Sequence, residues 1–324
     1  MNPPSNLLPD AEALGAAETP FQQVWRTFRR DRLAMAGLVV LASLVVLAFL
    51  GKLLTEWWVV FDPATVRLPD KLLPPLSTPS HSLAKELLPP LGAYPFGTDE
   101  LGRNVFARML QGSFVSLSVG IVAVSISLVI GITVGGLAGF YGRRKLAFVS
   151  IDTWLMRLTD VVLCFPTFFL ILTVVALLPP SIYNIMIVIG ITSWMGTARF
   201  VRAEFLALRE QDFVTAAKAL GLPELRIIFR HMVPNALAPV LVSATIDVAY
   251  AILTESALSF LGFGVRPPYA TWGNILADGR SYIFDAPWLF VIPGSAILVV
   301  VLAFNLVGEG LRDAMNPKLR KRAS

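Results

Sequence analysis

Six long apolar segments constrain this chain more than any other feature of its sequence. A helix of about 20 apolar residues crosses the bilayer core of about 30 Å, because each residue advances the helix by about 1.5 Å. Segments of this kind, with few charges, are found at residues 33–54, 113–141, 148–178, 182–200, 236–259 and 288–311. Only helices satisfy their own backbone hydrogen bonds at this length in lipid. We therefore predict an all-α membrane protein with six transmembrane helices.

The composition favours a membrane protein over a soluble one. Hydrophobic residues make up 55% of the 324 residues and charged residues only 15%, whereas about a quarter of the residues in a soluble domain are charged. The net charge of +5 is too small an excess to indicate nucleic-acid binding. The single cysteine, Cys164, excludes an intrachain disulfide.

The positions of lysine and arginine predict the sidedness of the chain. Short cytoplasmic flanks of transmembrane helices are enriched in basic residues. Most basic residues share one side if the N-terminus is cytoplasmic, because they lie in the flanks 26–32, 143–145, 199–230 and 312–322. Both termini are then cytoplasmic. The first apolar segment is too long for the apolar core of a cleaved signal peptide, so we expect it to remain as a span.

These boundaries divide the chain into regions. They are a cytoplasmic N-terminal segment (1–32), a first transmembrane helix (33–54), an external proline-rich loop (55–112), a core with five transmembrane helices (113–311) and a basic cytoplasmic tail (312–324). Within the core, residues 201–235 are expected to form a cytoplasmic loop and residues 260–287 an external loop. An apolar stripe in the N-terminal segment predicts a helix lying in the interface, and an extension of the first span into solvent explains the stripe as well. The stripe consists of Phe21, Val24, Trp25 and Phe28.

The sequence contains no evident catalytic or metal-binding set. Its two histidines, His81 and His231, lie on opposite sides of the membrane in this topology, so they cannot share a metal ion or a proton. No G-x-x-x-x-G-K-[ST] segment is present, and we expect the chain to bind no ATP or other cofactor itself. A run of glycines with small-xxx-small spacing predicts a helix contact rather than a nucleotide loop. These glycines are Gly131, Gly135, Gly136 and Gly139.

A few ionisable residues lie within the predicted spans, where a charge costs about 2.5–3.5 kcal/mol at the bilayer centre. Arg157 and Asp160 are three residues apart near the cytoplasmic end of the third span, and we predict that they form a structural pair. Asp247 is near the middle of the fifth span, where a pathway role and structural hydrogen bonding both remain open. A pathway role is also open for Glu255, closer to the outer face. Pro166 predicts a kink in the third span.

The loop at 201–235 is regular enough to form two short helices. One apolar helical face is predicted for Phe213, Ala216, Ala217 and Leu220. Gly221 is suited to a left-handed C-cap, Pro223 to the first position of a second helix, and Pro234 to its end. The small, alanine-rich surface of this corner allows a partner to approach closely. A self-contained hairpin lying on the bilayer surface is the alternative interpretation.

The same loop carries a family resemblance. Ala216, Ala217, Gly221 and Pro234 resemble the E-A-A-x-x-x-G-x(9)-I-x-L-P loop of ATP-binding-cassette (ABC) importer permeases. The general pattern is not matched at Thr215, His231 and Val233, which replace its glutamate, isoleucine and leucine. Three further segments resemble the C-type permease subunit of the dipeptide, oligopeptide and nickel uptake systems, with Asn104 where the family usually has aspartate. These segments are P-F-G-T-D-E-L-G-R at 95–103, R-L-T-D at 157–160 followed by F-P at 165–166, and T-E-S-A-L-S-F-L-G-F-G at 254–264 followed by W-G at 272–273.

The resemblance implies a type I ABC importer permease fold in a bacterial cytoplasmic membrane. It implies that the chain pairs with a homologous B-type permease, two cytoplasmic ATPases and an external substrate-binding protein. ATP and Mg would be bound by the ATPase partners. The loop that carries Phe213, Thr215 and Leu220 would couple them to a translocation path for peptides, and the chain itself would not catalyse a reaction.

Three other functions compete with a peptide importer permease. A nickel or metal-chelate importer of the same family shares this scaffold. An ion-coupled secondary transporter would use Asp247 or Glu255, but it would more often show inverted repeats, which are not evident here. A membrane-embedded enzyme would need a clustered nucleophile, base or metal set, which Cys164 and two separated histidines do not supply.

Overall fold

The computed structural model describes residues 20–80, 89–142, 144–146, 148–265 and 267–315. Within these ranges the chain is helical apart from loops and one antiparallel hairpin, formed by β1 (Lys145–Leu146) and β2 (Val149–Ser150). The α-helices are α1 (Pro20–Arg30), α2 (Arg32–Lys52), α3 (Val105–Tyr141), α4 (Ile151–Leu163), α5 (Thr167–Leu177), α6 (Ile182–Ile191), α7 (Trp194–Arg209), α8 (Asp212–Ala219), α9 (Glu224–Ile227), α10 (Val233–Phe260), α11 (Trp272–Gly279) and α12 (Trp288–Met315). Short turns of π-helix form η2 (Leu53–Trp57) and η5 (Ile228–Met232), and turns of 3-10 helix form η3 (Leu68–Asp70) and η6 (Arg280–Tyr282).

Up to six membrane spans can be counted among the described residues. Four helices are long and apolar enough to cross a bilayer without a break: 32–57, 105–141, 224–260 and 288–315. Two further spans are bent pairs, in which α4 and α5 meet at 77° and α6 and α7 at 40°. The predicted all-α architecture is thus confirmed, and the kink predicted at Pro166 is found between α4 and α5.

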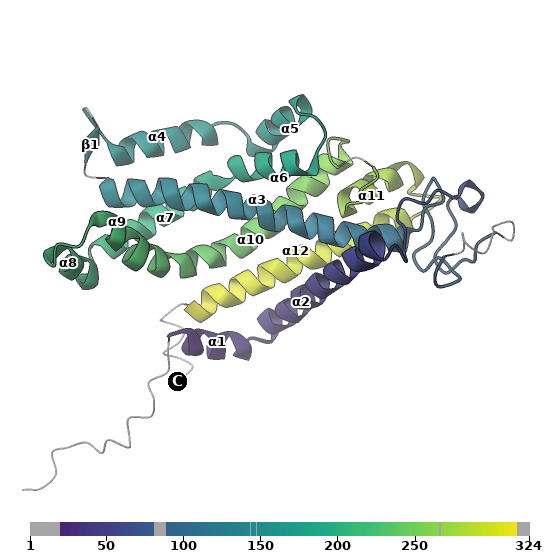
Figure 1. Cartoon of the computed structure of the whole chain (residues 1–324), viewed down its shortest axis with the longest axis horizontal. Coiled ribbons are helices and arrows are strands. Elements are labelled where there is room, and N and C mark those ends of the chain that lie inside the picture. The colour runs from purple at the N-terminus through teal and green to yellow at the C-terminus, as the bar shows by residue number, and fades with distance from the viewer. Residues whose placement is uncertain (1–19, 81–88, 143, 147, 266, 316–324) are drawn as a thin grey trace, which may run out of the picture.

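Helix α3 runs through the middle of the helix bundle. It packs against α2 on one side and against α4, α6, α7 and α10 on the others. Figure 1 shows α8, α9 and the β-hairpin at one end of the molecule, and α11 with the long segment that follows α2 at the opposite end. The loop predicted at 201–235 and the loops predicted as external thus lie at opposite ends of the molecule.

The starts of α3 and α2 test two predictions made from the sequence. Helix α3 begins at Val105, earlier than predicted, because the Asn104 side chain accepts hydrogen bonds from the backbone N–H groups of Phe106 and Ala107 and so caps the helix. The first turns of α3 thus occupy the end of the region predicted as an external loop. The N-terminal helix α1 is a separate helix and not an extension of the first span, because Asp31 interrupts the chain and caps α2. Its Phe28 is buried beside Gly310 of α12.

The prediction that Pro234 ends a short helix is wrong. Helix α9, the π turn η5 and α10 form one continuous helix from residue 224 to residue 260, and Pro234 lies in the first turn of α10. A π turn widens the hydrogen-bond ladder locally, so the missing N–H and the ring of a proline are accommodated without ending the helix. The Asn235 side chain donates a hydrogen bond to the carbonyl of His231 in this turn.

Helices α3 and α7 approach each other closely along the predicted glycine run. A Cβ atom added to Gly135 would lie 2.3 Å from the carbonyl oxygen of Ala198. Additions at Gly131 and Gly139 would lie 2.7 Å from Thr197 and 2.5 Å from Phe205. The helix contact predicted from the small-xxx-small spacing is confirmed, and it leaves no room for a side chain at these positions.

Buried charges tie the segment after α2 to α11. The Asp99 carboxylate is fully buried, and its Oδ2 lies 2.6 Å from both Arg103 Nε and Arg108 Nη1. Asp278 of α11 completes the cluster, with its Oδ2 3.0 Å from Arg108 Nη2 and 3.4 Å from Arg103 Nη2. Each buried charge faces an opposite one, which a buried ionic group needs in order to be tolerated.

A second buried carboxylate orders the same segment. Burial alone would raise the pKa of Asp70, but hydrogen bonds from Ser80 and Tyr94, and the charge of Arg67, outweigh that effect. The pKa of Asp70 is therefore held below its ordinary value, and its carboxylate stays ionised at neutral pH. A segment rich in proline, which cannot form a long helix, is thus fixed by side-chain hydrogen bonds.

The α3–α7 contact gives a first prediction. We predict that Gly135→Ala destabilises the protein by about 1–3 kcal/mol, because its methyl group would meet a backbone oxygen that cannot move aside. Gly294→Ala in α12 is the matched control: its Cβ would lie 3.6 Å from Leu276, an ordinary contact, so it should be neutral or stabilising by up to about 1 kcal/mol. Thermal unfolding of the purified variants measures both, and equal melting temperatures would contradict the proposed close contact.

Candidate functional site

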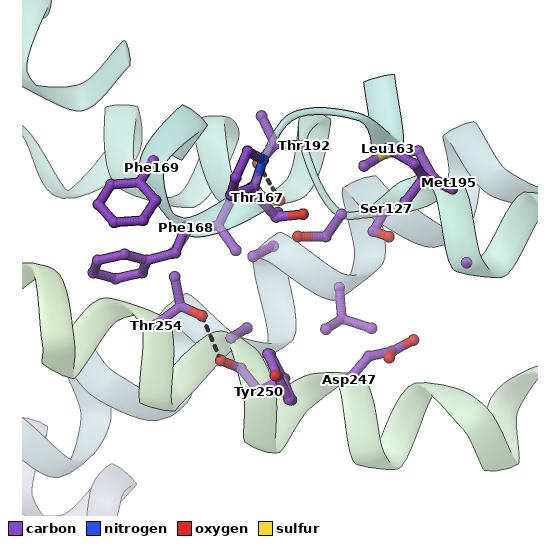
Figure 2. A pocket seen from close by; sticks show the side chains of 17 residues that line it. Ser127, Leu163, Thr167, Phe168, Phe169, Thr192, Met195, Asp247, Tyr250 and Thr254 are labelled. Atoms are coloured by element: carbon purple, nitrogen blue, oxygen red, sulfur yellow. Dashed lines mark hydrogen bonds between the residues drawn. The ribbon is translucent and has the colours of Figure 1, made fainter. Parts of the chain in front are cut away.

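A cavity of about 490 Å³ lies where the two bent spans break. Figure 2 shows it enclosed by α10 on one side and by the broken helices on the other, with the side chains of Thr167, Thr192, Asp247 and Thr254 around it. Helix α3 contributes Ser127 to its wall. The cavity therefore combines polar groups from four spans within an otherwise apolar bundle.

The chain breaks at the cavity for local chemical reasons. Pro166 has no N–H and stands before the first residue of α5, where it separates α5 from α4. Between α6 and α7, Thr192 and Ser193 leave helical geometry, and no side chain caps the first turn of α7. Backbone outside a regular helix is tolerated at membrane depth only where protein covers it or where it lines a wet cavity. Both breaks meet this condition because their residues line the cavity or are covered by the bundle.

One face of α10 forms the opposite wall. Asp247, Tyr250 and Thr254 follow at spacings of three and four, and all three line the cavity. The Thr254 hydroxyl donates a hydrogen bond to the Tyr250 carbonyl one turn earlier, so it is satisfied within the helix. Asp247 is half-buried and makes no hydrogen bond or ion pair with another described residue. Its carboxylate is thus directed toward the cavity, as Figure 2 shows.

Glu255 lies elsewhere. Its side chain is fully buried on a different face of α10, and it is not among the residues that line the cavity. Its Oε1 accepts a hydrogen bond of 2.7 Å from Ser259, one turn later in the same helix. Nearby, Gly273 of α11 packs against Ser256 and Ser259 so closely that an added Cβ would lie 2.7 Å from the Ser256 Cα. The structure thus brings Asp247 to the cavity and places Glu255 in the packing of α11 on α10.

The predicted pair of Arg157 and Asp160 is wrong. Asp160 pairs with Arg199 of α7, and Asp152 accepts hydrogen bonds from both Nε and Nη2 of Arg202 in the same helix. Within one helix, a pair is more favourable when the acidic residue precedes the basic one, and Arg157 precedes Asp160. Helix α7 instead presents its own arginines to the aspartates of α4. Arg157 lines the charged groove that these pairs form between α4 and α7.

The loop at 201–235 forms an elbow at one end of the molecule (Figure 1). Helices α8 and α9 are joined through Gly221, whose φ of +73° confirms the predicted left-handed C-cap. Pro223 caps α9 and is not its first residue. The face predicted for α8 is only partly correct, because Ala217 is buried together with Val214. Those two small side chains seat α8 on the helix bundle, next to Phe205 and Ile227.

The outward side of this elbow is apolar and exposed. Leu220 is 80% exposed and Phe229 is 69% exposed, and two further large apolar side chains beside them are also open to solvent. The set consists of Phe213, Leu220, Leu225 and Phe229, and we refer to it as the elbow patch. Thr215 and Ala216 are exposed on the same helix. Exposed large apolar side chains gathered at one end of a protein are typical of an interaction site.

Sequence reasoning missed several of these residues. The hydroxyl groups of Ser127, Thr192 and Ser193 come from helices that meet only in the fold. Tyr250 and Thr254 could have been found, because they share a helical face with Asp247 within an apolar span. Leu225 and Phe229 could have been identified as exposed residues of the elbow patch only by knowing which side of the elbow packs on the helix bundle. His81, in contrast, lies outside the described residues.

Comparisons with known proteins place the chain in a family. The model of the binding-protein-dependent transport system inner membrane component matches residues 129–321, more than half of the chain. A second model, the N-terminal transmembrane domain of oligopeptide transport permease C, matches residues 19–75. The two models together cover the first and the last predicted spans and the elbow.

Curated relatives match over almost their whole length. A dipeptide transport system permease protein of Alkalihalophilus pseudofirmus is 38% identical over 312 residues, which are 96% of this chain and 94% of the relative. A di/tripeptide transport system permease protein of Pseudomonas aeruginosa is 39% identical over 305 residues, 94% of each chain. An oligopeptide transport system permease protein of Bacillus subtilis is 34% identical over 330 residues, 99% of each chain.

A solved structure shares the fold. A chain of a methionine ABC transporter in an inward-facing conformation superposes with a TM-score of 0.50 and 18% identity, over 65% of this chain and 98% of that one. At this identity the likeness concerns the fold alone, and it agrees with the predicted importer permease fold. The resemblance found in the sequence is confirmed, and the chain belongs to the family of inner membrane components of binding-protein-dependent transport systems.

Proposed function

We propose that this chain is one transmembrane half of an ATP-driven peptide importer in the bacterial cytoplasmic membrane. The observation that carries the proposal is the near full-length similarity to relatives named as dipeptide and oligopeptide permeases. The cavity at the two helix breaks supports it, because a transport path needs polar surface at membrane depth. A nickel or metal-chelate importer of the same family is the second candidate, but the relatives reported above carry peptide names.

The proposed partner within the membrane is a homologous permease. The cavity is open on one side, where Tyr250 is 73% exposed and Phe169 is exposed as well. Charged and hydroxyl groups are costly against lipid. A second permease that covers this side would turn the open cavity into an enclosed path. Substrate would be delivered to that path by an external binding protein.

The elbow patch is the proposed contact with the cytoplasmic ATPases. Phe213, Leu220 and Phe229 present apolar surface that a partner can bury, and aromatic anchors of this kind carry much of the energy of an interface. ATP and Mg would bind to those partners, and this chain would conduct and couple without catalysis. Both termini and the elbow would then be cytoplasmic.

The continuous helix 224–260 supports a mechanism for coupling. It begins beside the elbow at Glu224 and contains Asp247 of the cavity wall, so a displacement of the elbow is carried to the cavity by one rigid element. Closure of the ATPases on ATP would push the elbow, and the two permeases would rock to open the path alternately to each side. Such rigid-body motion requires only that the elbow geometry is preserved.

The elbow turn gives a second prediction. We predict that Gly221→Val abolishes ATPase association or ATP-driven uptake while the chain still inserts, because a β-branched residue is disfavoured at φ +73°. A Cβ at this position would meet no atom within 4 Å, so the effect is one of backbone conformation and not of crowding. Gly221→Asn is the matched control and should keep most activity, since asparagine tolerates the left-handed region. Wild-type uptake by Gly221→Val, with the complex intact, would count against coupling through the elbow.

The topology gives a third prediction. On a Cys164→Ser background, Phe284→Cys should react with a membrane-impermeant thiol reagent in intact cells, because Phe284 is 95% exposed at the end that carries α11. Thr215→Cys, exposed on α8, should react only after the cells are permeabilised. The reverse labelling pattern would overturn the sidedness, and with it the cytoplasmic position of the elbow.

The cavity gives a fourth prediction. Asp247→Asn keeps the volume of the side chain and removes its charge. We predict that ATP-driven dipeptide uptake by the assembled complex falls at least about tenfold, whereas co-purification of the partner subunits and basal ATPase activity persist, because the carboxylate bonds to no other described residue. Loss of assembly would show that Asp247 serves packing between the permeases. Unchanged uptake would leave the residue with no part in transport.

A further inference from the structure

The central cavity has an unusual balance of polar groups. Of the residues that line it, Asp247 is the one with an ionisable acidic or basic side chain. The other polar lining residues carry hydroxyl groups: Ser127, Thr167, Thr192, Ser193, Tyr250 and Thr254. A site built in this way offers one negative charge surrounded by hydrogen-bond acceptors that are neutral.

These polar groups fit an ammonium group better than a divalent metal ion. Divalent metal ions are held by several carboxylate, imidazole or thiolate ligands. Among the described residues, no three or more histidine, cysteine, aspartate or glutamate side chains are grouped so that they could hold a metal ion. A primary ammonium group carries a single charge and three N–H donors, which one carboxylate and neighbouring hydroxyl oxygens can satisfy.

We propose that this cavity is the subsite for the ammonium end of the transported molecule, with Asp247 as the residue that selects for it. The proposal rests on the proposed peptide importer function and names the part of the substrate that this half of the path recognises. Asp247 and Thr254 are separated by seven residues of α10, or roughly 10 Å along the helix axis, which is enough for an ammonium group and the first residue of a peptide.

The surroundings of the cavity also explain why the Asp247 carboxylate is available to bind a cation. Thr254 and Thr192 donate their hydroxyl hydrogens to backbone carbonyls of their own helices, so neither is directed at Asp247. The arginines nearest along α7 are engaged with other acids, Arg199 with Asp160 and Arg202 with Asp152. Thus the described chain leaves the charge of Asp247 uncompensated, and an incoming cation would supply the compensation.

The charge of the cavity can be tested without relying on the external binding protein. Thr254→Cys on a Cys164→Ser background places a thiol in the cavity wall, in membrane vesicles that contain the whole transporter. We expect a cationic methanethiosulfonate reagent to modify this thiol about tenfold faster than an anionic one of similar size, the effect of one charge roughly 10 Å away in partly screened surroundings. Asp247→Asn should remove this preference and Asp247→Glu should retain it. Asp62→Asn, which neutralises an exposed carboxylate in the segment after α2 and frees no arginine, is the control and should change nothing.

Protection by peptides tests the ammonium group itself. Dialanine at millimolar concentration should slow modification of the cavity thiol, whereas N-acetyl-dialanine, which has no ammonium group, should not. Equal reagent rates in the presence of Asp247, or equal protection by both peptides, would overturn the proposal. Tyr250→Cys repeats the measurement at a second lining position, and failure of both thiols to react would overturn it by showing that the cavity is closed to water-soluble molecules.

These outcomes are separate from a failure of the proposed function. If the wild-type transporter showed no ATP-driven uptake of dipeptides, the peptide importer assignment would fall whatever the thiol rates were. If uptake occurred but the cavity thiol showed no charge preference, only the role of Asp247 as the ammonium subsite would be lost.

Discussion

The close contact between α3 and α7 is the constraint on which the remaining arrangement depends. A Cβ atom at Gly135 would lie 2.3 Å from the carbonyl oxygen of Ala198, so backbone meets backbone at this contact. Helix α7 begins at one wall of the cavity and leads at its other end to the elbow. Because glycine removes the side chains that would separate the two helices, dispersion forces and short-range contacts fix α7 against the central helix. The cavity and the elbow are thereby held in one frame.

The polar groups of the cavity are mainly hydroxyl groups set among apolar side chains. A broken span exposes N–H and C=O groups that a straight helix would have paired, and these must find water or polar side chains. The two breaks line the same cavity, which reduces the polar surface directed at lipid. The protein therefore gains a hydrophilic site with a single ionisable residue, Asp247, and avoids the larger cost of several charges at this depth.

Local chemistry explains which features could be predicted from the sequence. The six spans, the kink at Pro166, the packing role of the glycine run and the left-handed Gly221 each depend on residues close together in the chain. The break at Thr192 and Ser193 has no proline to signal it, and the nearby Gly190 is equally consistent with close helix packing. The partner of Asp160 is 39 residues away, and Asp278 is 170 residues from Arg108, so both pairings depend on the tertiary fold. The prediction that Pro234 ends a helix failed because the π turn before it, which accommodates the proline, has no sequence signature of its own.

The π turn η5 also fixes a rotational relationship between two distant parts of the chain. In a continuous helix each residue turns the following ones by about 100°, so the number of residues between the elbow and Asp247 decides the direction in which the carboxylate is aimed. A π turn holds one residue more than the α turn it replaces. Gaining or losing a single residue between Gly221 and Asp247 would therefore swing the carboxylate from the cavity to another face of the helix. In an evolving family, length changes in this stretch should be selected against.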